Sequence, residues 1–158
     1  MEMSSERAVP ANLATTWAVL NDPEALKACI TGCERFELVA PDQYDMTMAV
    51  KVGPVGFKFK GKMTLSDVVP LSSYAIKFEG QGGMAGFAKG TAQVNVAAQG
   101  EGTALQYTVN AQVGGKLAQL GSRLIDSSAK KMADDFFEKL AARLTSPEAS
   151  ATTAPIPQ

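Results

Sequence analysis

The feature of this sequence that most constrains its fold is a stripe of apolar positions near the C-terminus. A helix of about 40 Å is predicted over residues 117–144, because the stripe recurs at steps of three and four residues. Its positions are Leu117, Leu120, Leu124, Ser128, Met132, Phe136, Leu140 and Leu144. A helix of that length needs a broad apolar partner to cover its stripe.

A pattern of the opposite period fills the middle of the chain and supplies that partner. Apolar and polar side chains alternate in runs at about residues 44–52, 55–65, 74–78, 88–96 and 105–113. Such alternation is typical of half-buried antiparallel strands joined by short turns. Glycines within the runs, at Gly61, Gly80 and Gly90, suit bends that curve a sheet.

The first part of the chain predicts one strand and two short helices. Residues 2–9 can form an edge strand, and Asn12 can cap a helix over residues 13–20. Asp22 and Pro23 start a second helix, which should end near Cys29. Because sheet and helices are segregated along the chain, the predicted class is α+β. We expect a curved antiparallel sheet of about seven strands wrapped on the C-terminal helix, with an apolar cavity between them.

Composition places the chain among globular domains. With 158 residues, of which 46% are hydrophobic, one domain is expected at residues 1–145. A tail rich in Pro, Ala, Ser and Thr follows at 146–158 and is predicted to be disordered. The net charge of −1 gives no reason to expect a nucleic-acid partner. The N-terminus lacks the apolar core of a signal peptide, so we expect a cytoplasmic protein.

No catalytic or metal-binding constellation is readable in the sequence. There is no histidine, and Cys29 and Cys33 alone are too few for a zinc site, so both are expected to be reduced thiols. Acidic residues at Asp134, Asp135 and Glu138 fall between the stripe positions, on an expected solvated helix face. A lesser alternative is an enzyme that acts through its tyrosines, although no nucleophile–base pair accompanies them: Tyr44, Tyr74 and Tyr107.

What remains is an inward-facing set rich in methionine and phenylalanine. These adaptable, polarisable side chains suit a flat apolar guest, although they also suit an ordinary filled core. The candidate ligand-binding residues are Met46, Met48, Phe57, Phe59, Met63, Phe78, Phe87, Tyr107, Leu120, Leu124, Ser128 and Met132. Among them, Ser128 and Tyr107 are the polar groups expected to reach a polar head group.

A second candidate surface consists of lysines expected on the opposite, outward face of the sheet. They are Lys58, Lys60, Lys62, Lys77 and Lys89. If their strands are neighbours, these lysines form a basic patch that could dock an acidic partner or anionic lipid. The alternative is a solvated surface that discourages edge-to-edge pairing of sheets.

Several stretches of the chain carry a family resemblance over about residues 1–144. They are MEM at the start, Trp17 with LNDP at 20–23, LKACITGCE at 26–34, KVGPV at 51–55, FKGK at 59–62, GGMAGFAKG at 82–90 and VGGKLAQLGSRLI at 113–125. With these stretches the chain resembles the family of carbon monoxide dehydrogenase G-subunits, part of the START-like (SRPBCC), or helix-grip, superfamily. It departs from the family at Thr31, where proline is usual.

The resemblance implies a helix-grip fold and a non-enzymatic, accessory role beside a molybdenum hydroxylase of the carbon monoxide dehydrogenase type. It implies that a respiratory quinone, of the menaquinone or ubiquinone type, is carried in the cavity between that enzyme and the inner face of the cytoplasmic membrane. The alternative is a membrane-recruitment or assembly factor that carries no ligand. Longer members end in a linker and a membrane-binding segment; here the linker-like residues 146–158 are followed by no amphipathic helix.

Overall fold

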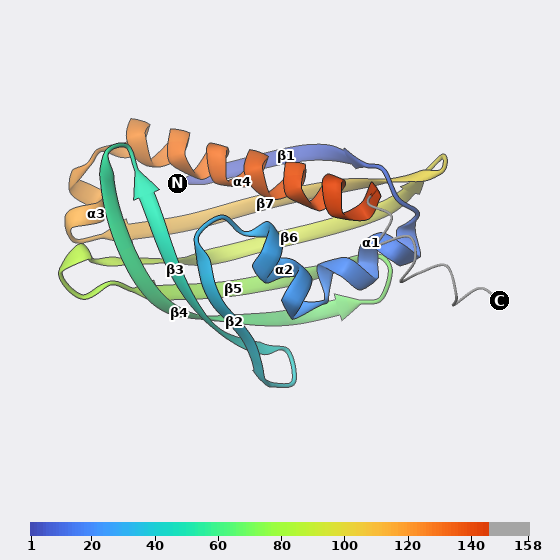
Figure 1. Cartoon of the computed structure of the whole chain (residues 1–158), viewed down its shortest axis with the longest axis horizontal. Helices are drawn as coiled ribbons and strands as arrows, with labels where there is room; N and C mark the ends of the chain where they lie inside the picture. Colours follow the sequence, from blue (N-terminus) through green and yellow to red (C-terminus); the bar gives the residue numbers. More distant parts are fainter. Residues whose placement is uncertain (146–158) are drawn as a thin grey trace.

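The computed structural model describes residues 1–145, and the tail predicted at 146–158 lies outside the described residues. Seven strands curve beneath one long helix (Figure 1). The strands are β1 (Glu2–Val9), β2 (Cys33–Ala40), β3 (Gln43–Val52), β4 (Val55–Val69), β5 (Ser73–Gln81), β6 (Phe87–Gln99) and β7 (Gly102–Gly114). The helices are α1 (Leu13–Leu20), α2 (Pro23–Cys29), α3 (Lys116–Gln119) and α4 (Ser122–Thr145), with a 3-10 turn η1 (Gly83–Ala85).

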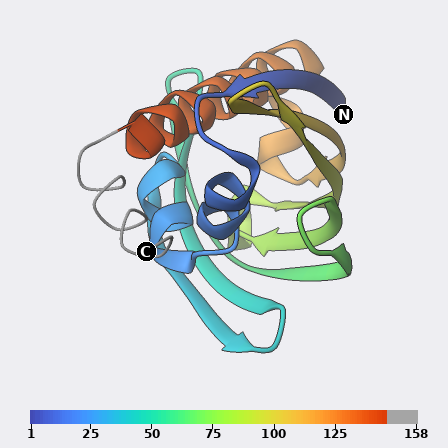
Figure 2. The same ribbon diagram turned by 90° about the vertical axis from the view of Figure 1, so that its right-hand side faces the viewer.

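The sheet is an antiparallel meander closed by its first strand. Its order is β1-β7-β6-β5-β4-β3-β2, so the first two strands along the chain form its two edges. Strand β1 pairs with β7, with Glu2 opposite Asn110. Figure 2 shows the sheet curving around the space beneath α4, with α1 and α2 at the near end. The predicted α+β class, the meander and the two short helices after the first strand are confirmed.

The two short helices begin where their capping residues predict. The side chain of Asn12 accepts a hydrogen bond from the backbone N–H of Thr15 at 2.8 Å, and that of Asp22 accepts one from Glu24 at 3.1 Å. Helices of this length are marginal in isolation. Their buried faces hold them in place: α2 packs against β2 and α4, and its Ala25 is fully buried.

The prediction of one continuous helix over residues 117–144 is wrong, because the chain forms two helices there. Helix α3 ends at Gln119, and Gly121 adopts a φ of +92° before α4 begins at Ser122. Glycine adopts this left-handed conformation at little cost, so the chain can change direction there. In the first turns of α4, Ile125 is therefore buried, whereas Leu124, a position of the predicted stripe, is only half-buried.

The inward face of the sheet carries a strip of small residues that runs across β4, β5 and β6. The register places Gly61 opposite Gly80, and Gly80 opposite Ala88. A Cβ added to Gly61 would lie 2.4 Å from a backbone oxygen of β5, so only glycine fits this position. Because these positions and the nearby Ala92 project so little, the sheet does not fill the space beneath α4.

Candidate ligand-binding cavity

An apolar cavity of about 500 Å³ lies between the sheet and the first half of α4. Small-molecule pockets in proteins usually enclose roughly 300–1,000 Å³. The α4 side of the cavity is formed by Ile125, Ser128, Ala129, Met132, Ala133, Phe136 and Phe137. Inward residues of the strands and a few from α1 and α2 form the other walls. The predicted hollow between sheet and helix is therefore present.

Eight of the twelve predicted ligand-binding residues line this cavity. They are Met46, Met48, Phe59, Met63, Phe78, Tyr107, Ser128 and Met132. The sheet register explains how strands distant in sequence bring them together: Met48 lies opposite Phe59, and Met63 opposite Phe78. That these side chains contact a ligand stays a prediction.

The other four predicted residues lie outside the cavity wall as the described part of the chain forms it. Phe57, Leu120 and Leu124 pack in a second apolar cluster built on Val52, Phe59 and Leu117, at one end of the cavity. Phe87 lies beside Gly114, and the ammonium of Lys89 sits 5.5 Å from the centre of its ring. Alternation identifies the face of a strand on which a side chain lies, but not how far along the strand the cavity extends.

Several aromatic side chains that were not predicted as ligand-binding also line the cavity. They are Phe36, Tyr44, Tyr74, Phe136 and Phe137. The rings of Phe36 and Tyr44 lie 5.1 Å apart, and Tyr74 packs edge-on against Trp17 of α1 at 5.5 Å. The alternation that identified Met46 would also have found Tyr44. Phe137 lies beside the helical stripe rather than on it, so the period alone does not reveal it.

Hydroxyl groups supply hydrogen-bonding capacity within this apolar lining. Within residues 1–145, the hydroxyls of Tyr44, Tyr74 and Ser128 form no hydrogen bond with other side chains or backbone. All three residues line the cavity, so their hydroxyls can donate to a bound molecule. Burial raises the pKa of Tyr74, and burial together with the charge of Asp42 raises the pKa of Tyr44. Both phenols are therefore neutral donors near pH 7.

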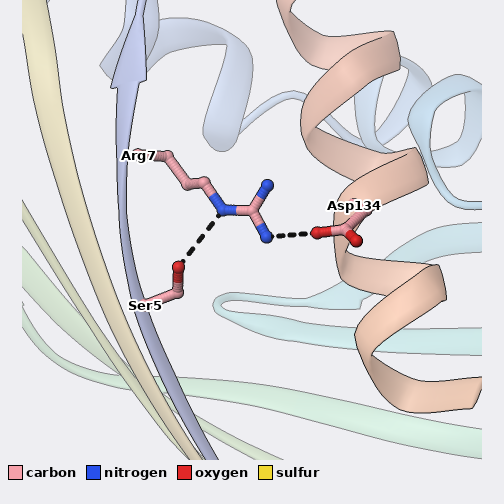
Figure 3. A network of polar contacts seen from close by, with 3 residues as sticks. All are labelled: Ser5, Arg7 and Asp134. Carbon is pink, nitrogen blue, oxygen red and sulfur yellow. Dashed lines mark hydrogen bonds and ion pairs between the residues drawn. The ribbon is translucent and has the colours of Figure 1, made fainter. Parts of the chain in front are cut away.

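Two polar contacts tie α4 to the regions of both sheet edges. The Arg7 guanidinium of β1 lies 2.5 Å from the Asp134 carboxylate and also donates to Ser5 at 3.3 Å (Figure 3). It covers the ring of Phe137, 4.9 Å from the ring centre. The hydrogen bond to Asp134 raises the pKa of Arg7. On the other side, the Lys139 ammonium donates to the hydroxyl of Thr31, at 3.0 Å, just before β2.

These contacts refine two expectations from the sequence. Asp134 was expected only to face solvent, but it pairs with a strand distant in sequence. Thr31, the position at which the family resemblance implied proline, provides the hydroxyl that accepts the hydrogen bond from Lys139.

The predicted lysine surface lies on the outer face of the sheet. Lys58, Lys60 and Lys62 are on β4, Lys77 is on β5 and Lys89 is on β6, and all five are exposed. Carboxylates interrupt this surface: Asp45 and Glu79 flank Lys62 in the register, and Glu34 pairs with Lys58 at 2.9 Å. The three strands are neighbours, which was the condition for a basic patch. Docking by this surface stays a prediction.

Residues 1–145 contain no group of three His, Cys, Asp or Glu side chains that could hold a metal ion. None of the helices formed by them combines the length and apolarity needed to cross a bilayer. Cys29 is buried, Cys33 is half-buried, and both are free thiols whose pKa is raised by burial.

Comparison with solved structures identifies the fold class. A conserved protein from Geobacillus kaustophilus is 28% identical, with a TM-score of 0.86 over 96% of this chain and 97% of that chain. A START superfamily protein from Mycobacterium smegmatis is 16% identical, with a TM-score of 0.68 over 90% of this chain and 95% of that one. Ara h 8.0201 is 14% identical, with a TM-score of 0.65 over 91% and 97% of the two chains. The last two share the fold alone.

Comparison of sequences identifies the family. No curated protein matches the chain. A family model described as the carbon monoxide dehydrogenase G-subunit (CoxG) matches residues 6–145, from β1 through to the last residue of α4. The match therefore includes the second half of β1, strands β2–β7 and the helix that covers the cavity. This chain belongs to the CoxG family, which is accessory to carbon monoxide dehydrogenase.

Proposed function

We propose that this protein carries a lipophilic molecule, a respiratory quinone of the menaquinone or ubiquinone type, between the cytoplasmic membrane and a molybdenum hydroxylase of the carbon monoxide dehydrogenase type. The observation that carries the proposal is the apolar cavity of about 500 Å³ beneath α4. A carrier needs enclosed apolar area and does not need an acid, a base or a metal. Family membership supports the choice of partner enzyme.

The lining residues suit the chemistry of a quinone. Aromatic and methionine side chains are suited to contact with a flat ring, and Met48, Phe59 and Phe78 line the cavity from three neighbouring strands. The carbonyl oxygens of such a ring accept hydrogen bonds, which the hydroxyls of Ser128 and Tyr74 can donate. Each CH₂ of an isoprenoid tail contributes about 0.8 kcal/mol on burial, so even a short tail supports micromolar affinity.

The direct test is to identify what the protein carries. The full chain is purified from a quinone-containing bacterium, extracted with organic solvent and analysed by mass spectrometry, and the expected result is a co-purified quinone. Ala92→Phe should reduce the amount, because Ala92 faces the cavity from β6. Gln93→Phe is the matched control, since Gln93 is the next residue and is exposed. Wild-type extracts without any lipid would count against carriage.

A second candidate function is recruitment or assembly of the hydroxylase without a carried ligand. The observation that favours it is the set of five exposed lysines on three neighbouring strands. Changing Lys58, Lys60 and Lys62 to glutamate should then abolish capture of the purified enzyme and leave the quinone content unchanged. Normal capture, combined with loss of activity in the Ala92→Phe variant, would favour the carrier.

The surroundings of Tyr44 and Tyr74 do not favour a role for these two phenols as nucleophile or base. A phenol acts as a nucleophile or base in its ionised form. Burial raises the pKa of both Tyr44 and Tyr74, which disfavours that form at neutral pH.

A further inference from the structure

Three connections meet at one end of the molecule and form a surface that shares only Lys58 and Lys89 with the lysine surface of the sheet. They are residues 51–58 around the β3–β4 turn, residues 80–89 around η1, and residues 114–123 around α3 (Figure 1, left). A Cβ on Gly53 would lie 3.1 Å from Leu124, and one on Gly115 would lie 2.5 Å from Gly86. The connections therefore pack directly on one another, and we call their combined surface the basic tip.

All charged side chains of the basic tip are cationic. Its three segments contain Lys51, Lys58, Lys89, Lys116 and Arg123, all of them exposed, and no aspartate or glutamate. Lys58 pairs with Glu34 of β2. Within residues 1–145, the other cations of the tip form no ion pair. Glu79, one residue before the second segment, lies opposite Lys89 in the register. Lys51, Lys116 and Arg123 therefore carry the positive charge of the tip that no carboxylate of residues 1–145 pairs.

The basic tip also exposes apolar side chains at its surface. Met84, in the single turn of η1, is 79% exposed, and Val55 at the start of β4 is 38% exposed. Gly83 precedes Met84 with a φ of +59°, in the glycine-rich run that forms this turn. Exposed apolar residues surrounded by lysine and arginine are typical of surfaces that sit at a membrane interface.

The opposite end of the molecule has the reverse charge. The β2–β3, β4–β5 and β6–β7 turns, at residues 38–43, 66–73 and 99–102, carry Asp42, Asp67 and Glu101 and no lysine or arginine. In a meander these turns lie at the end away from the β3–β4 and β5–β6 connections. An anionic surface would therefore attract one end of the protein and repel the other, which sets the orientation of approach.

We propose that the basic tip docks on anionic lipid headgroups, with Met84 entering the interface. This inference rests on the proposed function and names the surface through which the carrier meets the membrane. Val52, Phe59 and Leu117 of the cluster inside the tip also line the cavity. Docking by the tip therefore brings the end wall of the cavity against the lipid.

The test is co-sedimentation of the full chain with vesicles that contain no quinone. We expect binding to phosphatidylcholine vesicles that include phosphatidylglycerol, little binding to pure phosphatidylcholine, and weaker binding at high salt. Each cation near an anionic membrane contributes to binding, so the combined Lys51→Gln, Lys116→Gln and Arg123→Gln variant should bind roughly a hundredfold more weakly. Met84→Asp should also weaken binding. Its matched control is Val69→Asp at the acidic end, a residue that is 53% exposed.

Two results would overturn the inference. One is equal binding of the triple variant and the wild type to the anionic vesicles. The other is no vesicle binding at all combined with loss of hydroxylase capture by the triple variant, which would make the tip a protein-docking surface. Failure of the proposed quinone carriage is a separate outcome. Solvent extracts of the purified protein would then contain no lipid, while vesicle binding that depends on the tip persisted. The Ala92→Phe variant should bind vesicles normally, because Ala92 lies inside the cavity.

Discussion

The two halves of α4 contact the rest of the molecule in different ways. In the second half, Leu140 is 1% exposed and Leu144 is 6% exposed, and both belong to the main core cluster. In the first half, Ser128 and Met132 are half-buried and face the cavity. One helix is therefore a close-packed core element near its C-terminus and the cover of a hollow near its N-terminus. The comparison shows that the cavity lies mainly beneath the first half of α4, and that the closely packed second half can stabilise the fold.

The partners of each half account for the difference. The second half packs on α2, whose Ala25 and Cys29 are fully buried. The first half lies over the strip of small residues at Gly61, Gly80 and Ala88, which do not project far enough to reach it. The following predictions test this comparison, from the largest expected effect to the smallest.

The largest effect is expected from Leu140→Ala in the packed half. Removing a fully buried leucine typically lowers the free energy of unfolding by about 2–5 kcal/mol, through lost burial and the cavity left behind. Urea denaturation would measure it. The matched variant in the hollow half is Met132→Ala, which should cost clearly less, because the Met132 side chain already borders empty space. Equal costs for the two variants would contradict the comparison.

The pH dependence of stability probes the boundary between the packed and hollow parts, where Tyr74 contacts Trp17 and also lines the cavity. Burial raises the Tyr74 pKa, so the folded state retains this proton to higher pH than the unfolded state. Stability is full below the unfolded pKa of about 10 and falls above it, by at most about 1.4 kcal/mol per pH unit. Chemical denaturation at several alkaline pH values should show a shallower loss in Tyr74→Phe. Identical slopes would mean that Tyr74 ionises as readily as an exposed phenol.

Within the hollow half, Ser128→Ala tests whether the α4 hydroxyl serves a bound molecule. Its hydroxyl has no partner within residues 1–145, so its removal should leave the free energy of unfolding nearly unchanged. If it donates to a quinone oxygen, the dissociation constant should rise by about three- to tenfold, the value of one net hydrogen bond. A titration of purified protein with a short-tailed quinone, followed by fluorescence of Trp17, would measure it. Unchanged affinity would assign the polar contact to another group.

The smallest effect is expected from Arg7→Met, which removes the ion pair between β1 and α4. The side chain of Arg7 is 26% exposed and that of Asp134 is 48% exposed, so solvent screens the pair and its loss should cost about 0.2–1 kcal/mol. Thermal unfolding would detect the change. A loss of several kcal/mol would show that the contact is essential for keeping α4 in place.

Local sequence features predicted most of the fold. Asn12 and Asp22 marked the starts of α1 and α2, and the period of two identified the strands and the inward faces. These signals act between residues near one another in sequence, so they can be read without a structure. The same alternation placed Met46, Met63 and their neighbours at the cavity.

Features that depend on distant contacts were not predicted. The break at Gly121 leaves no mark on a helical period, because the apolar stripe continues across it. Phe57 follows the alternation of its strand and Leu124 follows the helical period, as the cavity residues do. Both nevertheless lie where the connections close one end of the cavity. Asp134 resembles any solvated acid in sequence, and its partner Arg7 is on another element.

The pairing of the first strand with the last has a consequence for synthesis on the ribosome. The N-terminal ammonium of Met1 donates to the carbonyl of Ala111, 110 residues away along the chain. During synthesis the edge of β1 therefore stays unpaired until β7 has been made, and the apolar interior is covered only once α4 has emerged. Contacts so distant in sequence slow folding. An unpaired edge strand and an open apolar face both favour aggregation, so the nascent chain is most exposed to it before α4 emerges.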